Sequence, residues 1–438
     1  MEKNRDAPLR DFLAGMPELA ALGGLLEPGQ ECYLVGGLVR DLLLGRSIAM
    51  GDIDLLTSGD PSPLARRFAA RIHGHFFFMD EERGHSRVVV SARKEMPAFD
   101  FAPFRAADLA GDLGARDFTL NALAWPLHLP PAQGRLIDPL EGWNDCRMGL
   151  LRRCAPDVLQ ADPLRVLRGV RLAVQLNFAM EEETQRLMEE AVPGLRRVAG
   201  ERILAELGKI FSSADVLRGA ALLREVGCLA FFFGPATAPE KAFAGALELL
   251  KRTETCFRIF PEIWLAEEIE NGWSRAALLR FAALLQGCGV AKEDGGWQQT
   301  LPFSRNSRHM IGDLATVPAG LCDDYLSLIS SNRGKALWLC AQGKHPLEKM
   351  IFAFLLAGDK VEPYRDGLDE AFYLWEEHVV EGRIPPLVSA EELRKRFGLP
   401  AGPRIGELLR RLAEEEISGE VGSREEALKW LRRELERD

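Results

Sequence analysis

The stretch YLVGGLVRDLLLGRSIAMGDIDLLT, residues 33–57, decides how the N-terminal part of the chain folds. It begins with an apolar run at residues 33–35 that is typical of a buried strand. Gly36 and Gly37 then open a predicted helix that ends at Gly45, and a glycine corner of this kind lets backbone amides approach a phosphate. We therefore expect a strand, a helix and a second strand in close succession.

The second predicted strand carries Asp52 and Asp54 on either side of Ile53. Side chains alternate along a strand, so both carboxylates point to one face while Ile53 points to the core. Two carboxylates this close repel each other, and a divalent cation relieves the repulsion. The pair therefore predicts a catalytic Mg²⁺ site at Asp52 and Asp54. Taken separately, a glycine pair is more often a simple turn and an Asp-x-Asp pair a chance feature of a surface strand, but their order within one unit favours a catalytic site.

Length and composition describe an ordinary globular protein. The 438 residues are enough for two to four domains, and 47% of them are hydrophobic. There is no apolar run of membrane-spanning length, and the N-terminus does not have the pattern of a secretory signal. The 8 cysteines have no spacing that suggests zinc and are typical of reduced thiols, so we expect a cytoplasmic protein.

The charge is unevenly distributed. The formal net charge is -10, which argues against indiscriminate coating of nucleic acid. Arginine is nevertheless concentrated between Arg135 and Arg202, whereas Asp and Glu dominate the later predicted helices. A basic cleft on an acidic body favours a defined RNA substrate, and we expect neither DNA nor a membrane as a partner.

The predicted fold class is α+β. A helix is expected at residues 63–72, followed by strands at residues 75–79, 87–90 and 99–101, which favours a small, mixed, largely antiparallel sheet backed by helices. From residue 201 onward the pattern is helical to the end of the chain. Two of the last helices are expected to start at capping boxes, Ser389 with Glu392 and Ser423 with Glu426.

Two further segments carry polar residues with possible roles at a site. Asp117 is expected to cap a helix beginning near Phe118, and the preceding Arg116 either contacts a triphosphate or is a solvated loop residue. Asp138 and Gly142 belong to a loop that is expected to act as a hinge between a strand and a helix.

The segment ADPLRVLRGVRLAVQL, residues 161–176, predicts a helix that starts at Asp162 and carries Arg165, Arg168 and Arg171 along one flank. The simpler interpretation is a helix cap followed by solvated arginines. An aspartate beside an arginine can also read a base, because the carboxylate accepts from the exocyclic amino group of C or A and the guanidinium donates to the ring nitrogen. G and U present a carbonyl oxygen and a ring N–H at these positions, so the carboxylate would face an acceptor and the guanidinium a donor. The pair would therefore accept C and A and reject G and U.

Taken together, the motifs resemble the class II tRNA nucleotidyltransferase and bacterial poly(A) polymerase family. The resemblance consists of five blocks in family order between residues 33 and 211. The matching residues are Gly36, Gly37, Arg40, Asp41, Asp52, Asp54, Arg116, Asp117, Phe118, Thr119, Asn121, Asp138, Pro139, Gly142, Asp162, Arg165, Arg168, Arg171, Glu201, Arg202, Glu206 and Leu207. The segment at residues 386–409 also resembles the tail of the tRNA-specific members.

The resemblance implies an enzyme that uses CTP and/or ATP to extend the 3′ end of tRNA. It implies a nucleotidyltransferase head at residues 1–150, a nucleotide-recognising neck at 151–215, a helical body at 216–380 and a tRNA-binding tail at 381–438. Asp52 and Asp54 would bind Mg²⁺, and Asp138 and Gly142 would form the hinge. The implied nucleotide-binding residues are Gly36, Gly37, Arg40, Arg116, Asp162, Arg165, Arg168 and Arg171.

The chain departs from the family pattern in three places. Ala115 stands where the family usually has a second arginine, and Ala161 where it usually has glutamate. The interval between Phe101 and Arg116 is short, and in this family that region carries a flexible loop needed for adding the terminal A. The short interval favours CC addition, while CCA addition, A addition and poly(A) synthesis remain alternatives. An inactive RNA-binding relative and nucleotidyl transfer to a small molecule are further hypotheses.

Overall fold

The computed structural model describes residues 5–46, 52–90, 96–234, 240–289, 296–318, 320–358, 362–379 and 384–437. Its contacts divide the chain into two compact units. The first comprises Met1–Ile203 with Glu225–Cys228, and the second comprises Leu204–Arg224 with Leu229–Asp438.

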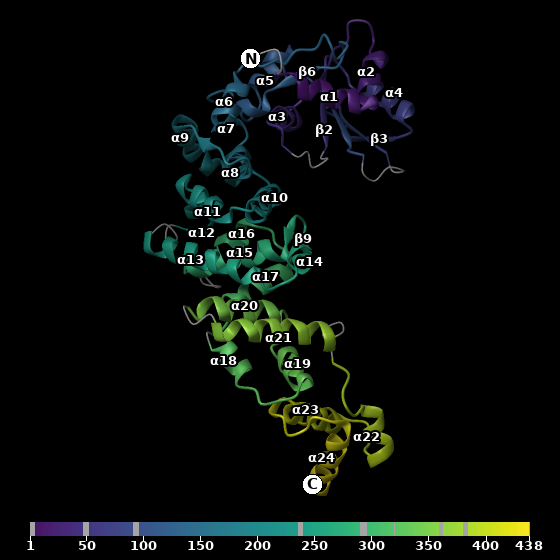
Figure 1. Ribbon diagram of the computed structural model, residues 1–438, viewed down its shortest axis with the longest axis vertical. Coiled ribbons are helices and arrows are strands. Elements are labelled where there is room, and N and C mark those ends of the chain that lie inside the picture. Colours follow the sequence, from purple (N-terminus) through teal and green to yellow (C-terminus); the bar gives the residue numbers. More distant parts are fainter. Residues whose placement is uncertain are drawn as a thin grey trace. The chain divides into compact units, whose positions relative to one another are not determined.

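The first unit contains a 6-stranded sheet with the order β3-β4-β5-β2-β1-β6. Figure 1 labels β2, β3 and β6 of this sheet. The strands are β1 (Cys32–Val35), β2 (Ile53–Thr57), β3 (His75–Asp80), β4 (His85–Val89), β5 (Phe99–Pro103) and β6 (Ala124–Pro126). Neighbouring strands are antiparallel except β2 and β5, which are parallel. The predicted small, mixed and largely antiparallel sheet is thus confirmed, and β5 lies in its interior beside β2.

Helix α4 (Ser62–Ile72) packs against one face of this sheet. Its Phe68 side chain is fully buried, and its ring lies 4.9 Å from that of Phe99 and 5.6 Å from that of Phe101. Since side chains alternate along β5, Asp100 between these phenylalanines points to the opposite face. Because α4 covers the apolar face of the sheet, Asp100 and the other polar residues lie on the opposite face.

One predicted helix is wrong. Instead of a helix continuing from Phe118 to Leu123, the chain forms a single 3₁₀ turn at Thr119–Asn121 and then enters β6. The Thr119 amide donates to the Arg152 carbonyl at 2.9 Å, and the Gly36 amide donates to the Leu123 carbonyl at 3.3 Å. Bonds to distant segments therefore replace the local helical bonds, and tertiary context overrides helix propensity.

The first unit also contains further α-helices. Their bounds are α1 (Ala7–Gly15), α2 (Pro17–Leu22), α3 (Gly37–Leu43), α5 (Leu109–Gly114), α6 (Gly142–Met148), α7 (Val158–Ala161), α8 (Leu164–Leu176) and α9 (Glu182–Ala191). A short parallel pair, β7 (Leu150–Leu151) and β8 (Ala179–Met180), also belongs to this unit. Helix α10 (Gly200–Phe211) begins in the first unit and ends in the second.

The second unit is helical apart from the short pair β9 (Glu268–Glu270) and β10 (Trp273–Ser274) among its described residues. Its larger helices include α11 (Val216–Glu225), α13 (Glu240–Phe257), α15 (Arg275–Gly287), α17 (Arg305–Leu314), α19 (Asn332–Ala341), α20 (Pro346–Leu356) and α21 (Glu362–His378). Trp273 is fully buried against Phe211 and Phe281, and its indole N–H donates to the Leu204 carbonyl at 3.0 Å. The predicted helical remainder is confirmed.

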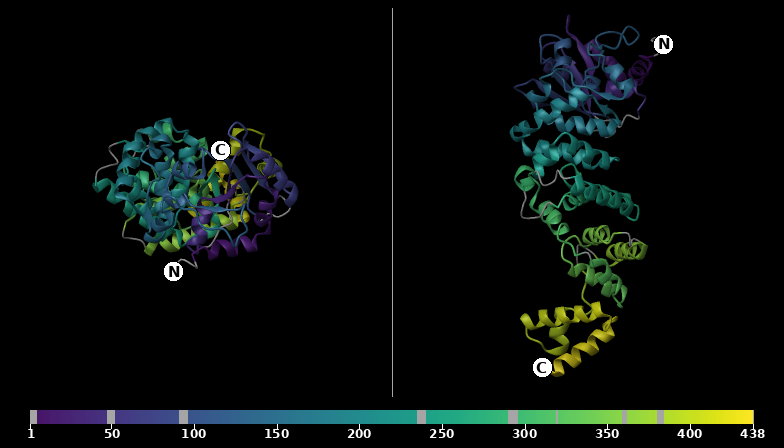
Figure 2. Two further views of the ribbon diagram at one scale, coloured as in Figure 1. Left: turned by 90° about the horizontal axis from the view of Figure 1, so that it is seen from above. Right: turned by 90° about the vertical axis from the view of Figure 1, so that its left-hand side faces the viewer.

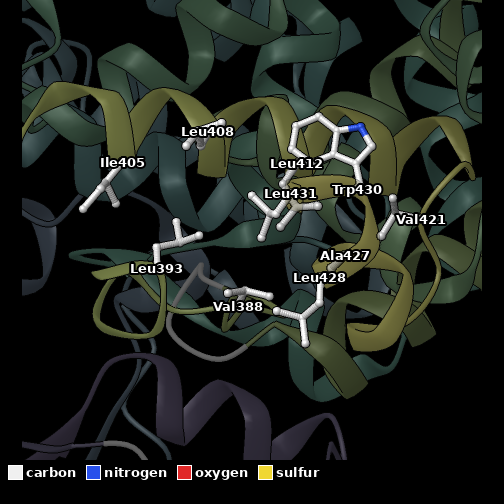
Figure 3. Close-up of a cluster of buried hydrophobic side chains, with 10 residues drawn as sticks. All are labelled: Val388, Leu393, Ile405, Leu408, Leu412, Val421, Ala427, Leu428, Trp430 and Leu431. Atoms are coloured by element: carbon white, nitrogen blue, oxygen red, sulfur yellow. The ribbon is translucent and has the colours of Figure 1, made fainter. Parts of the chain in front are cut away.

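The last three helices share an apolar core of their own. Helices α22 (Ala390–Phe397), α23 (Pro403–Ser418) and α24 (Arg424–Arg437) lie together in Figure 1 and in the right-hand view of Figure 2. Figure 3 shows the side chains that fill the space between them: Val388, Leu393, Ile405, Leu408, Leu412, Val421, Ala427, Leu428, Trp430 and Leu431. The predicted caps are confirmed, because Ser389 Oγ accepts from the Glu392 amide at 3.1 Å and Ser423 Oγ from the Glu426 amide at 3.3 Å.

The eight cysteines are all free, as expected for reduced thiols. None of the described helices has both the length and the apolar character needed to cross a membrane.

Candidate active site

A pocket of about 420 Å³ opens over the polar face of the sheet in the first unit. Carboxylates and guanidinium groups line it together. They are Asp54, Asp100, Asp117 and Asp162 with Arg105, Arg116, Arg165, Arg168 and Arg202. Five residues predicted from the sequence thus meet in one pocket: Asp54, Arg116, Asp162, Arg165 and Arg168.

The sheet register arranges acidic residues next to each other. Ile53 is 1% exposed while Asp52 and Asp54 on either side of it are exposed, as the alternation predicts, although β2 itself begins only at Ile53. Asp54 on β2 pairs with Asp100 on β5. Asp100 therefore adds a third carboxylate to the predicted pair.

Arg87 on β4 joins two of these carboxylates. Its guanidinium donates to both oxygens of Asp100 at 2.6 Å and also to Asp52 Oδ2 at 2.6 Å. Such a bidentate arrangement is geometrically specific and holds Asp100 in a fixed orientation. The positive charge of Arg87 also offsets part of the repulsion between the acids.

The surroundings of Asp54 disfavour its ionised form. Partial removal of its carboxylate from solvent raises its pKa, and Asp100 and Asp52 raise it further, while Arg116 and Arg168 act in the opposite direction. A carboxylate crowded in this way gains from binding a cation.

The glycine corner lies directly beside Asp54. Gly36 has a φ of 81°, which favours glycine. A Cβ at this position would lie 3.2 Å from Asp54 Oδ2 and 3.5 Å from Arg116 Nη1. Gly37 begins α3, and a Cβ there would lie 3.2 Å from Arg40 Nη2. Glycine at 36 thus satisfies both the backbone conformation and the close approach of the site.

Two arginines predicted to contact a triphosphate are held differently. Arg40 is buried, donates to both oxygens of Asp41 at 2.9 and 2.8 Å, and donates to Asn121 Oδ1 at 2.6 Å. Arg116 faces the pocket and donates to Asp112 Oδ1 at 3.3 Å and to the Asn121 carbonyl at 3.4 Å. Arg116 is therefore at the pocket wall, whereas Arg40 ties α3 to the segment containing Asn121.

Asp162 accepts hydrogen bonds at both of its carboxylate oxygens. Its Oδ1 accepts from the Leu164 amide at 3.3 Å at the start of α8, as a cap does, while its Oδ2 accepts from Arg202 at 3.3 Å. Arg165 follows on α8 and donates to the carbonyls of Arg116 and Val158, both at 3.3 Å. Asp162 and Arg165 are thus adjacent, oriented and in contact with the pocket.

Arg168 is anchored by Asp117. Its Nε donates to Asp117 Oδ2 at 3.0 Å, and Asp117 Oδ1 accepts from the Phe118 amide at 2.8 Å and from Asn121 Nδ2 at 3.1 Å. Burial alone would raise the pKa of Asp117, but the Arg168 guanidinium and the hydrogen bonds from Asn121 and Phe118 hold it below its ordinary value. Asp117 therefore joins α8 to the chain segment after α5, while Arg171 lies farther along α8 and does not line the pocket.

The predicted hinge residues lie where α6 begins. Asp138 accepts hydrogen bonds from the amides of Gly142 and Trp143, at 2.7 and 2.9 Å. A Cβ at Gly142 would lie 2.0 Å from the Thr119 carbonyl oxygen, so the backbones of α6 and Thr119 approach too closely for any side chain. The glycine is thus required by packing.

Comparison with known proteins gives the family of this chain. Residues 32–152 match the model of the poly A polymerase head domain, and residues 177–241 match that of the probable RNA and SrmB-binding site of polymerase A. A CC-adding tRNA nucleotidyltransferase of Geobacter sulfurreducens is 32% identical over 432 residues, which cover 97% of this chain and 95% of the relative. The chain belongs to the tRNA nucleotidyltransferase and poly(A) polymerase family.

Further relatives of this family agree over nearly the whole chain. A CC-adding tRNA nucleotidyltransferase of Thermus thermophilus is 30% identical over 437 residues, covering 92% of this chain and 93% of the relative. The solved structure of the Thermotoga maritima CCA-adding enzyme complexed with tRNA has a TM-score of 0.70 and 24% identity, with 97% of this chain and 96% of that chain covered. The resemblance inferred from the motifs and the predicted fold class are both confirmed.

Sequence reasoning about this nucleotidyltransferase missed Asp100, Arg87 and Arg105. Asp100 lies between Phe99 and Phe101 in the same alternation that identified Asp54, and this was the signal available for it. The pairing of β2 with β5 across more than 40 residues of sequence is what brings it to the site. Arg202 was noted in a family block but was not assigned to the site.

The ion pair between Asp117 and Arg168 gives a prediction for stability. Asp117→Asn is expected to lower the free energy of unfolding by about 2 kcal/mol at pH 7, because a buried charge partner is lost and Arg168 is partly solvated. A carboxyl with a depressed pKa in the folded state contributes stability above its ordinary value of 3.8 and loses it as pH falls through the depressed value. The difference between wild type and variant in urea unfolding should therefore shrink at pH 3.

The matched control is Asp11→Asn on α1, where the side chain is exposed. This variant is expected to unfold within about 0.5 kcal/mol of wild type. Equal destabilisation of both variants, or a difference independent of pH, would contradict the assigned role of the Asp117 carboxylate.

Proposed function

We propose that this protein is a template-independent nucleotidyltransferase that adds C to the 3′ end of tRNA and stops after CC. The 3′-hydroxyl of the tRNA attacks the α-phosphate of CTP, forming the new phosphodiester bond while the bond to pyrophosphate breaks. The observation that carries the proposal is one pocket in which Asp54 and Asp100 lie together with Asp162 and Arg165. The residues proposed for phosphoryl transfer and those proposed for base recognition therefore line the same pocket.

The acidic residues of the site fit a divalent metal ion, and we propose Mg²⁺ held by Asp52 and Asp54. Among the residues that the structure describes, no group of three or more His, Cys, Asp or Glu side chains forms a metal cage. The two carboxylates of Asp52 and Asp54 suit Mg²⁺, which is usually held by one or two carboxylates together with substrate phosphates and water. When bound at Asp52 and Asp54, such an ion would lower the pKa of the attacking hydroxyl and offset the charge that develops on the phosphate oxygens.

Residues in and around the pocket bind and orient the nucleotide. We assign Gly36, Gly37, Arg40 and Arg116 to the triphosphate side, since the glycine corner lies directly beside Asp54 and Arg116. The base is read by Asp162 and Arg165, whose carboxylate and guanidinium match the edge of C or A and oppose that of G or U. Arg168 and Arg171 extend the positive flank of α8.

Ala161 and Ala115, the two residues that differ from the family pattern, lie in different surroundings. Ala161 ends α7 directly before Asp162, and Arg202 holds the Asp162 carboxylate from α10. Ala115 lies at the end of α5, and the neighbouring Arg116 faces the pocket. These contacts support a reading pair that is oriented without a glutamate at 161.

The restriction to CC is supported by the short connection between β5 and α5. β5 ends at Pro103 and α5 begins at Leu109, so 5 residues join them. The resemblance to the family implies that this region carries the loop needed for adding the terminal A. The CC-adding relatives of G. sulfurreducens and T. thermophilus agree with this choice.

The helical remainder is assigned to RNA binding. We propose a head at residues 1–150, a neck at 151–215, a body at 216–380 and a tail at 381–438, with Asp138 and Gly142 at a hinge. The tail has an apolar core of its own, which supports its treatment as a separate tRNA-binding domain.

The proposal is tested by incubating the purified protein and Mg²⁺ with tRNA that lacks CCA, tRNA that ends in CC, and an unrelated RNA. Each RNA is supplied with labelled CTP, labelled ATP or both. We expect two C residues on the first tRNA and no A on the second. Repeated ATP incorporation on all RNAs would indicate a poly(A) polymerase, and RNA binding with no incorporation would indicate an inactive relative.

A further inference from the structure

The edge strand β3 exposes two apolar side chains. Phe77 is 41% exposed and Met79 is 56% exposed. Phe76 and Phe78 alternate with them and point to the other face, where the Arg66 guanidinium of α4 lies 4.0 Å and 5.5 Å from their rings. Proteins usually place charged residues on an exposed edge, so an uncovered phenylalanine and methionine on one face call for a functional explanation.

This exposed face is continuous with the candidate active site. Phe77 pairs with Arg87, Arg87 with Asp100, and Asp100 with Asp54, so these residues form one row across four strands. With about 4.8 Å between neighbouring strands, Phe77 lies roughly 10 Å from Asp100 and 15 Å from Asp54 along the sheet. Met79 lines the same pocket as Asp54 and Asp100.

The in-line geometry of phosphoryl transfer indicates which substrate lies on the β3 side of the carboxylates. In phosphoryl transfer the attacking and leaving oxygens lie roughly in line on opposite sides of the phosphorus. The glycine corner assigned to the triphosphate follows β1, which borders β2 on one side, while β5, β4 and β3 follow on the other. With the triphosphate at the glycine corner, an attacking hydroxyl opposite it lies on the side of β5, β4 and β3.

We propose that Phe77 and Met79 form a stacking platform for the unpaired 3′-terminal bases of the tRNA primer. The inference rests on the proposed nucleotidyl transfer and adds a binding surface for its acceptor. Stacking on an aromatic ring tolerates any base, because every base has a π-face, and the methionine side chain adapts to irregular apolar contacts. This suits a primer end whose last base changes with each addition.

The test uses tRNA lacking CCA, with the fluorescent base 2-aminopurine as its last nucleotide. Phe77→Ala is expected to raise KM for this tRNA about 5- to 100-fold, the range for loss of one stacked base, with kcat and KM for CTP within about 2-fold of wild type. Phe77→Trp should restore the KM for tRNA, and Met79→Ala should raise it less. Quenching of 2-aminopurine on binding should occur with wild type and disappear with Phe77→Ala.

Two further variants control for the loss of an exposed apolar side chain and for a folding defect. Leu129→Ala removes an apolar side chain with similar exposure, 39%, just after β6 at the opposite edge of the sheet, and should leave every parameter unchanged. Phe77→Leu retains apolar volume without the ring and provides the same comparison if the alanine variant does not fold.

The outcomes separate the platform from the proposed reaction. An unchanged KM for tRNA in Phe77→Ala, or a rise in KM for CTP instead, would overturn the platform while leaving the reaction intact. Absence of CTP incorporation by wild type would overturn the proposed function, and the binding fluorescence would still report whether Phe77 stacks on the primer end.

Discussion

Asp54→Asn is expected to lower CTP incorporation at least about 1,000-fold while the protein remains folded. The amide has the size of the carboxylate but carries no charge, so it cannot support a metal ion worth several kcal/mol to the transition state. Folding should not suffer, because burial and the neighbouring carboxylates Asp100 and Asp52 raise the pKa of Asp54, so folding disfavours its ionised form. We therefore expect an unchanged or slightly higher melting temperature, a pattern typical of catalytic residues.

The measurement is single-turnover CTP incorporation on tRNA lacking CCA, together with thermal unfolding. Glu81→Gln provides the control, since it makes the same chemical change at an exposed position in the turn between β3 and β4, outside the pocket. Incorporation by Asp54→Asn within tenfold of wild type would remove Asp54 from the catalytic site.

Gly142→Ala is expected to destabilise the first unit by about 3 kcal/mol, among the largest effects of any single methyl group in this protein. The added carbon would lie 2.0 Å from the Thr119 carbonyl oxygen and 2.6 Å from its carbonyl carbon. Both neighbours are backbone atoms, so no side-chain rotation relieves the clash. Helix α6 would have to move away from Thr119, which would also disturb the buried hydrogen bond from Thr119 to Asp145 at 2.7 Å.

Differential scanning calorimetry would detect this as a fall of roughly 6–12 °C in the unfolding transition of the first unit. The control is Gly114→Ala at the end of α5, where an added Cβ meets nothing within 4 Å. That variant should melt at the wild-type temperature or slightly above it, since alanine favours helix over glycine. Equal melting temperatures for the two variants would show that α6 and Thr119 can separate at little cost.

Much of the local structure followed from sequence periodicity. The helix at 62–72, the first five strands of the sheet and the caps at Ser389 and Ser423 were predicted to within a few residues, because apolar periodicity and capping patterns are local features of the chain. The exception was the helix expected after Asp117, where the distant Arg152 carbonyl and the pairing of β6 replaced the local bonds.

The candidate site was predicted in part. The alternation around Ile53 identified Asp52 and Asp54, and the pattern of α8 identified Asp162 and Arg165. Asp100 shows the same alternation, but an acidic residue between two phenylalanines becomes part of a site only when its strand is known to pair with β2.

By itself, the sequence determined the class of the fold, the order of the motifs and the face on which each acidic residue of a strand lies, since these depend on chain-local geometry. The tertiary structure alone decided that β5 and β4 lie between the carboxylates of β2 and the apolar edge of β3, and that Arg87 joins Asp52 to Asp100. The physical reason is that strand order and register are set by hydrogen bonds and packing between residues far apart in the chain, and the two-residue period of a strand carries no information about its neighbours.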